Sequence, residues 1–172
     1  MTATLNDLFD NISVIENLFI FSNNSLISLE GLSNISTVGW LSVKNNDNLV
    51  NLEGISITSN IQMLFIEGND SLTDINGLQN IIGISGDFDI SLKILNNSSL
   101  TNLEGLSNIS YLGNYKDVEI SSNASLNNLC GLQTLLNGTF YGELIINTNA
   151  YNPTGQDIID GNCKMVTATN KN

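Results

Sequence analysis

The amino-acid sequence predicts a mainly β protein, built as a β-solenoid of about six coils and closed by a C-terminal cap. A unit of about 23 to 28 residues recurs along the chain, and periods of this length mark repeat architectures. Each unit contains a short segment of alternating apolar residues, which is typical of a strand with one buried face. The pattern stops after Asn149, where the cap is expected.

The repeat is clearest in two consecutive units, which begin at Leu41 and Leu64. Aligned from these residues to Gly54 and Gly77, the two units share every apolar position, the Asn and the Gly. The same Asn recurs at intervals of 23, 23, 28, 26 and 26 residues. It stands at Asn23, Asn46, Asn69, Asn97, Asn123 and Asn149. Because several columns repeat together, the pattern is of leucine-rich type.

Every unit is expected to begin with a strand whose apolar residues point inward, while the residue between them points out. The strands are expected near residues 18–20, 41–43, 64–66, 92–94, 118–120 and 144–146. The Asn after each strand turns the chain, and its side-chain amide can bond backbone groups that the turn leaves unpaired. A glycine marks the second corner, where we expect backbone angles that other residues resist. Extra residues around 85–91 and 114–117 are expected to form surface loops.

The cap is predicted over residues 150–163, with a short helical turn near residues 156–160. Cys130 lies in the last full repeat and Cys163 ends the cap, so a disulfide between them would tie the cap to the repeats. Such a bond implies an oxidising compartment; the alternative is two buried free thiols. Residues 1–163 are thus expected to form a single solenoid domain, followed by a flexible tail over the polar residues 164–172.

The charge balance excludes some functions. Seventeen acidic residues stand against five lysines, and the chain has neither Arg nor His. Nucleic-acid binding needs a basic surface, so it is not expected, and no apolar run is long enough to insert in a membrane. Without His, the chain lacks the commonest general base and transition-metal ligand. A pair of catalytic carboxylates stays formally open, but we predict a protein that is not an enzyme and needs no cofactor or metal.

Large apolar residues gather at outward positions of the first three strands. Neighbouring strands lie about 4.8 Å apart, so these side chains are expected to converge on one solvent-directed patch. The residues are Phe19, Phe21, Trp40, Met63 and Phe65. Exposed patches of this kind often mark interaction sites, so we interpret it as a docking surface for a protein or for sugar rings. The alternative is that a further N-terminal segment or a second copy of the chain covers it.

The repeat and cap together resemble the bacterial receptor-L-domain-like leucine-rich proteins, especially those of Bacteroidetes. The resemblance spans about residues 9–163 and depends on the Ser-Leu-x-x-Leu-Glu-Gly-Leu corners at 25–32 and 99–106. In the cap it depends on Cys130-Gly-Leu, Ala150-Tyr-Asn-Pro-Thr, Asp157-Ile-Ile and Gly161-Asn-Cys163. It implies a right-handed, single-coil β-solenoid and export from the cell. The C-terminal sorting domain common in that family is not in this sequence, and the family supplies no catalytic residues.

These observations predict a secreted or cell-surface module that is not an enzyme and that recognises or adheres to a protein or carbohydrate partner. The alternative is a purely structural spacer within a larger secreted surface protein.

Overall fold

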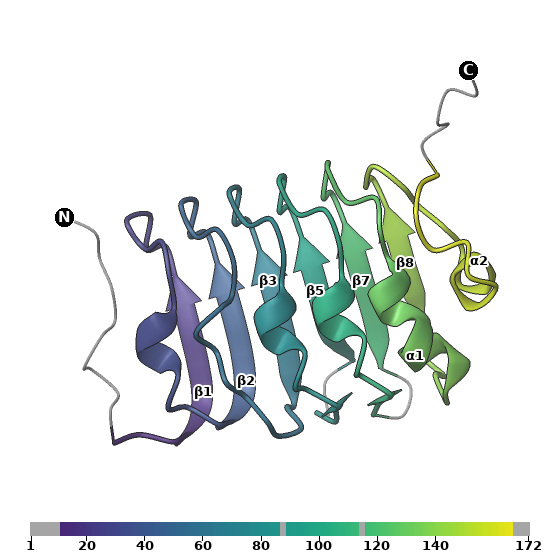
Figure 1. The fold of residues 1–172 in the computed structure, drawn as a ribbon. Coiled ribbons are helices and arrows are strands. Elements are labelled where there is room, and N and C mark those ends of the chain that lie inside the picture. The colour runs from purple at the N-terminus through teal and green to yellow at the C-terminus, as the bar shows by residue number, and fades with distance from the viewer. Residues whose placement is uncertain (1–10, 87–88, 114–115, 167–172) are drawn as a thin grey trace.

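The computed structural model describes residues 11–86, 89–113 and 116–166. The protein is mainly β, and six parallel strands form one sheet in the order of the chain (Figure 1). These strands are β1 (Val14–Phe21), β2 (Thr37–Lys44), β3 (Met63–Glu67), β5 (Ile90–Leu95), β7 (Asp117–Ser121) and β8 (Leu144–Asn147). All six segments expected from the alternating pattern lie within them. The strands pair without slippage over β1–β3, so Leu41 stands beside Leu18 and Leu64.

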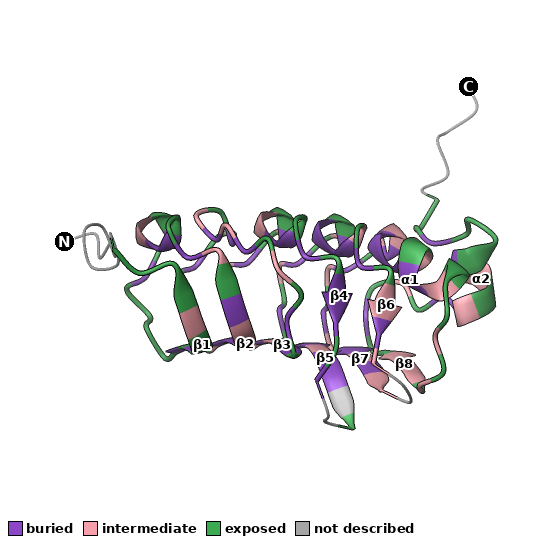
Figure 2. Ribbon diagram, turned by 90° about the horizontal axis from the view of Figure 1, so that it is seen from below, coloured by how far each residue is buried: buried purple, intermediate pink, exposed green. Residues whose placement is uncertain are grey.

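Short helices cover the inward face of this sheet (Figures 1 and 2). They are η1 (Glu30–Leu32), η2 (Asn76–Leu78), η3 (Glu104–Leu106), η4 (Cys130–Leu132) and α1 (Gln133–Asn137). All four 3₁₀ helices contain a glycine. In three of them a Cβ on the glycine, at Gly77, Gly105 or Gly131, would collide with a backbone carbonyl of the preceding repeat. The expected positive φ occurs at Gly54 but not at these three residues. Close stacking of successive repeats, rather than an unusual backbone angle, therefore requires glycine there.

A second, smaller sheet joins the two sides of the molecule. It consists of β4 (Gly83–Ile84) and β6 (Tyr111–Leu112), which pair in parallel. In Figure 2 these strands lie between the large sheet and the helices. The loops expected around 85–91 and 114–117 follow them, but residues 87–88 and 114–115 lie outside the described residues. The second expected loop, 114–117, ends at Asp117, which is the first residue of β7.

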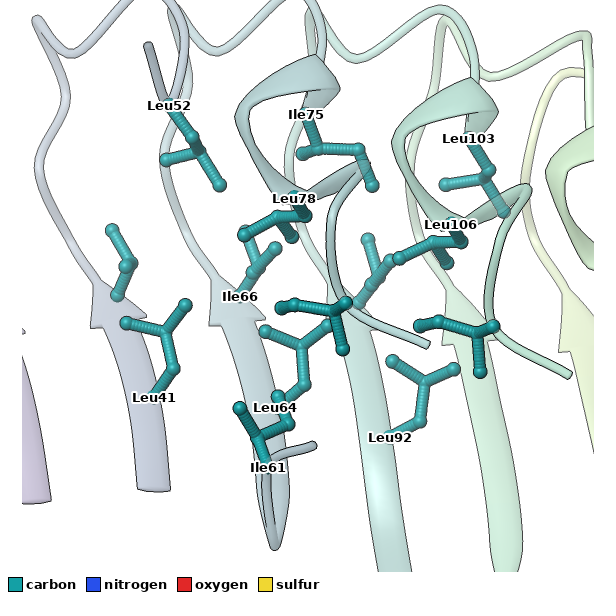
Figure 3. Close-up of a cluster of buried hydrophobic side chains, with 14 of the residues drawn as sticks. Leu41, Leu52, Ile61, Leu64, Ile66, Ile75, Leu78, Leu92, Leu103 and Leu106 are labelled. Atoms are coloured by element: carbon teal, nitrogen blue, oxygen red, sulfur yellow. The ribbon is translucent and has the colours of Figure 1, made fainter. Parts of the chain in front are cut away.

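The interior is one continuous cluster made of aliphatic side chains, apart from Cys163. Strand residues such as Leu64 and Ile66 meet residues of the opposite wall such as Ile75 and Leu78 (Figure 3). Each repeat supplies equivalent residues, so every layer packs against the next. No single repeat encloses this core, and its stability is therefore shared between neighbours.

Residues 150–163, the predicted cap, lie at the C-terminal end of the sheet (Figure 1). They contain α2 (Gly155–Ile159), whose N-cap Thr154 exchanges hydrogen bonds with Asp157 in a capping box. Cys130 and Cys163 form a disulfide, with their Cα atoms 4.9 Å apart. The chain stays attached beyond the cap, because Lys164 bridges to Asn128 and the Met165 N–H bonds the Asn127 carbonyl. The tail expected from residue 164 is therefore held at its first two residues, and residues 167–172 lie outside the described part.

Candidate binding surface on the first strands

The outward side chains of the large sheet form rows, because the strands pair in register. One row crosses the middle of the sheet and contains two of the five predicted residues, Phe19 and Phe65. It consists of Phe19, Ser42, Phe65, Lys93, Glu119 and Ile145. The neighbouring rows begin with Asn17, Trp40 and Met63 on one side and with Phe21, Lys44 and Glu67 on the other. The structure thus places the five predicted residues on one face of three adjacent strands.

Three of the five form a contiguous cluster, which we call the aromatic cluster: Phe19, Phe21 and Trp40. The rings of Phe19 and Phe21 stack with their centroids 5.5 Å apart, and Trp40 lies 6.4 Å from Phe19 at a tilted angle. Phe19 and Phe21 are 48 % and 46 % exposed. The Trp40 indole N–H donates to Gln62 Oε1 at 2.8 Å, which fixes the orientation of its ring. The cluster is thus an apolar surface with two exposed rings and a half-buried Trp40.

Met63 and Phe65 do not extend this cluster as expected. Met63 is only 8 % exposed, so the prediction that it faces solvent is wrong. Phe65 is half-buried, with the ammonium groups of Lys44 and Lys93 5.5 and 5.7 Å from its ring centroid. Those lysines pair with Glu67 and Glu119 at 2.9 and 3.2 Å. The ion pairs therefore enclose Phe65 and end the apolar surface at β3.

Ser42 is the residue that sequence reasoning missed. It occupies the row position between Phe19 and Phe65, yet it is 2 % exposed. Its hydroxyl has no hydrogen-bond partner among the described residues, and an unsatisfied buried hydroxyl costs about 1–3 kcal/mol. A small residue flanked by large rings on both neighbouring strands is the signal that could have found it. Ser42 thus forms a buried floor between the aromatic side chains.

Strand β1, which carries two rings of the cluster, lies at the edge of the sheet. Within the described residues, no strand pairs with its outer side. Val14 is 65 % exposed, and Ile12 just before the strand is also exposed. Glu16 is the only charged residue among the eight of β1. The apolar surface thus continues from the face of the sheet onto its edge.

The repeated asparagines hold the strand ends beside this surface. In the interior, the Asn46 N–H and Nδ2 both donate to Asn69 Oδ1, at 3.1 and 3.2 Å. Nδ2 also reaches a carbonyl of the preceding strand, as from Asn46 to Ile20. The same pattern runs through the other members of the ladder, Asn69, Asn97, Asn123 and Asn149. All five of these are buried, as expected, whereas Asn23 at the start of the ladder is exposed.

The ladder is directional, and its two ends differ. Each Asn donates its N–H to the Oδ1 of the next repeat, beginning with Asn23 to Asn46 at 3.0 Å. At the C-terminal end, Asn149 has no following repeat and donates instead to Oδ1 of Asn152 in the cap, at 3.0 Å. At the N-terminal end, Oδ1 of Asn23 receives no hydrogen bond from the described residues. At the C-terminal end the donor of Asn149 is therefore bonded by the cap. At the N-terminal end the Asn23 oxygen has no partner among the described residues.

The described residues contain no group of three or more His, Cys, Asp or Glu side chains placed to hold a metal ion. No helix of the described part is long and apolar enough to cross a membrane. An apolar groove of about 530 Å³ lies at the other end of the molecule, between α1, β8 and α2. It is lined by residues including Phe140, Leu144 and Ile159, and it is remote in sequence from the aromatic cluster.

Compared with known proteins, the chain matches no protein family, no curated protein and no solved structure.

Proposed function

We propose that this chain is a right-handed leucine-rich β-solenoid of receptor-L-domain-like type that acts outside the cell as a recognition or adhesion module. In this proposal it is not an enzyme, and it binds a protein or carbohydrate partner through the aromatic cluster. The periodic sequence and the parallel sheet of six strands support the architecture. The Cys130–Cys163 disulfide supports an oxidising compartment, because such bonds persist there.

The observation that supports binding is the clustering of the exposed Phe19 and Phe21 with the half-buried Trp40 on neighbouring strands of a sheet. Large aromatic side chains bury much area at little conformational cost, and they dominate the energetics of many interfaces. In this chain they also stand on a rigid element, which favours a defined binding geometry. Elsewhere on the same face, Lys93, Glu119 and Asp117 give a polar surface.

The test is a binding screen against surface glycans and surface proteins, comparing the wild type with Trp40→Ser and Phe19→Ser. Any specific partner should lose at least tenfold in affinity for each variant, because each removes a ring of the cluster. Ile82→Ser is the matched control, since Ile82 is an exposed aliphatic residue beside β4. Urea unfolding should change by less than about 1 kcal/mol for Phe19→Ser, as for other exposed positions.

Two results would contradict the proposal. Partners that bind all three variants as they bind the wild type would show that the cluster is not the binding surface. A large loss of stability in Phe19→Ser would show that the ring belongs to the folded core. A screen without any specific partner would instead favour the structural spacer.

A further inference from the structure

We propose that the outer edge of β1 binds an extended strand of a partner protein, which adds to the sheet in parallel. This inference deepens the proposed recognition function, and rests on it, by naming the class of partner. Three observations support it: the outer backbone of β1 and the oxygen of Asn23, neither of which has a partner among the described residues, and the geometry of the aromatic rings.

The backbone of β1 offers hydrogen-bonding groups on its outer side. Ser22, which follows the strand, donates its N–H to the Lys44 carbonyl of β2 at 2.9 Å. Successive residues of a strand direct their backbone groups to opposite edges, so Asn17, Phe19 and Phe21 direct theirs away from β2. No described strand meets these groups. An edge of this kind is a template for pairing with another strand.

Native proteins protect such edges with short strands, charges, proline or a covering segment. β8, at the other edge, has four residues, and the cap follows it directly (Figure 1). β1 has eight residues, a single charge and no proline. The described part of the chain therefore protects one edge of the sheet and leaves the other suited to pairing.

The asparagine ladder specifies the direction of the added strand. Within the protein, each repeat is bonded by the N–H and Nδ2 of the Asn that precedes it, as Asn69 is by Asn46. The Asn23 oxygen offers the same acceptor to a strand outside β1. An incoming strand fulfils this role when it runs parallel to β1 and ends in an Asn, because its amide then arrives beside Asn23. The added strand would then pair with β1 as β1 pairs with β2.

The ring geometry favours a polypeptide over a sugar as the occupant. Phe19 and Phe21 are stacked at an interplanar angle of 7°, so one face of each ring is already covered by the other and less ring surface remains for a sugar. The edge also offers N–H and C=O groups at the spacing of a β-strand, which another backbone matches. Val14 supplies an exposed aliphatic side chain next to them.

The probe is a fluorescein-labelled synthetic peptide with the sequence of residues 37–48, which contains β2 and the ladder residue Asn46. Bound outside β1, it would place Leu41 beside Leu18 and Asn46 beside Asn23. We expect saturable binding to the wild-type protein in fluorescence anisotropy. A peptide with Asn46→Ala should bind at least fivefold more weakly, and one with Val43→Pro should show no measurable binding.

The decisive protein variant is Asn17→Pro, which removes an outward N–H but none of the hydrogen bonds between β1 and β2. It should weaken peptide binding at least tenfold. Asn17→Ala removes the same side chain and keeps the N–H, so it isolates the contribution of the backbone. Circular dichroism of both variants checks that the sheet is intact. If Asn17→Pro does not fold, Phe19→Pro is compared with Phe19→Ala, so that both lose the ring and only the first loses the N–H.

Equal binding to the wild type and Asn17→Pro, or no binding to the wild type, would overturn the inference. Self-association that Asn17→Pro abolishes, without peptide binding, would also overturn it, because the occupant would then be a second copy. Trp40→Ser separates this inference from the proposed function. If ligands in the screen depend on Trp40 but the peptide does not bind, only the partner class is wrong.

Discussion

At the scale of single residues, the protein depends on one buried amide in each repeat from Asn46 onward. Asn69 donates Nδ2 to the Val43 and Glu67 carbonyls while its oxygen accepts from Asn46. An amide fits because it combines two donors with an acceptor. The sequence could predict this column, since residue type and spacing repeat together. The sequence could not predict that the residue before each of these asparagines has a positive φ. These residues are Ser22, Asn45, Gly68, Asn96, Ser122 and Thr148.

Replacing Asn69 by Ala should lower the free energy of unfolding by about 3 kcal/mol, because several buried partners lose their hydrogen bonds at ~1–3 kcal/mol each. Asn23→Ala is the matched control at the exposed end of the ladder, and its cost should stay below about 1 kcal/mol. Urea unfolding followed by circular dichroism measures both. Equal losses for the two variants would show that burial does not determine how much the amide contributes to the free energy of unfolding.

At the scale of elements, alternating apolar residues were sufficient to predict the six strands of the large sheet. β4 and β6 could not be predicted, because two-residue strands are too short to show alternation. The candidate surface was predicted only in part for a similar reason. Alternation shows which side of a strand a residue takes, but not whether neighbours then cover it, as happens to Met63 and Ser42.

The α2 element contains a pH-sensitive contact. Hydrogen bonds from the side chain and backbone of Thr154 lower the pKa of Asp157 below its ordinary value of 3.8. A carboxyl group whose pKa is lower in the folded protein stabilises it above the unfolded pKa, and this contribution is lost as pH falls through the folded pKa. The wild type should therefore have a higher Tm than Asp157→Asn at pH 6.

That difference in Tm should shrink as the pH falls below 3.8 and through the lowered pKa of Asp157 in the folded protein, in thermal unfolding scans of both proteins. Thr154→Ala removes the main cause of the shift and should reduce the pH dependence in the same way. A difference between wild type and Asp157→Asn that stays constant from pH 6 to pH 2 would refute the contribution of this contact.

At the scale of the whole molecule, the two ends of the sheet are finished differently. The cap, the disulfide and Asn152 complete the C-terminal end, and the Leu129 N–H bonds the Cys163 carbonyl at 2.8 Å. At the other end, β1 and Asn23 have no equivalent among the described residues. The sequence predicted the cap from the break in the repeat and from the two cysteines. The open edge follows from hydrogen-bond directions, which a residue pattern does not contain.

Changing both Cys130 and Cys163 to Ser should lower stability by about 3–4 kcal/mol, the loop-closure estimate for a loop of this size. Because repeats interact mainly with their neighbours, the loss should be local. Amide hydrogen exchange should accelerate at Leu129 and Tyr151, whose N–H groups bond at the cap, but not at Leu41. Uniform acceleration along the chain would indicate that the protein unfolds as a single unit.

The asparagine ladder also gives the molecule an electrical direction. Its amides are joined donor to acceptor from Asn23 to Asn152, so their dipoles point the same way and each hydrogen bond polarises the next. The negative end of this dipole chain is the Asn23 oxygen, beside the free edge of β1. An approaching amide is attracted there with its N–H groups first, whereas a carboxylate is repelled. The ladder that stabilises the interior therefore ends beside the first strand in an acceptor, which matches an incoming N–H donor.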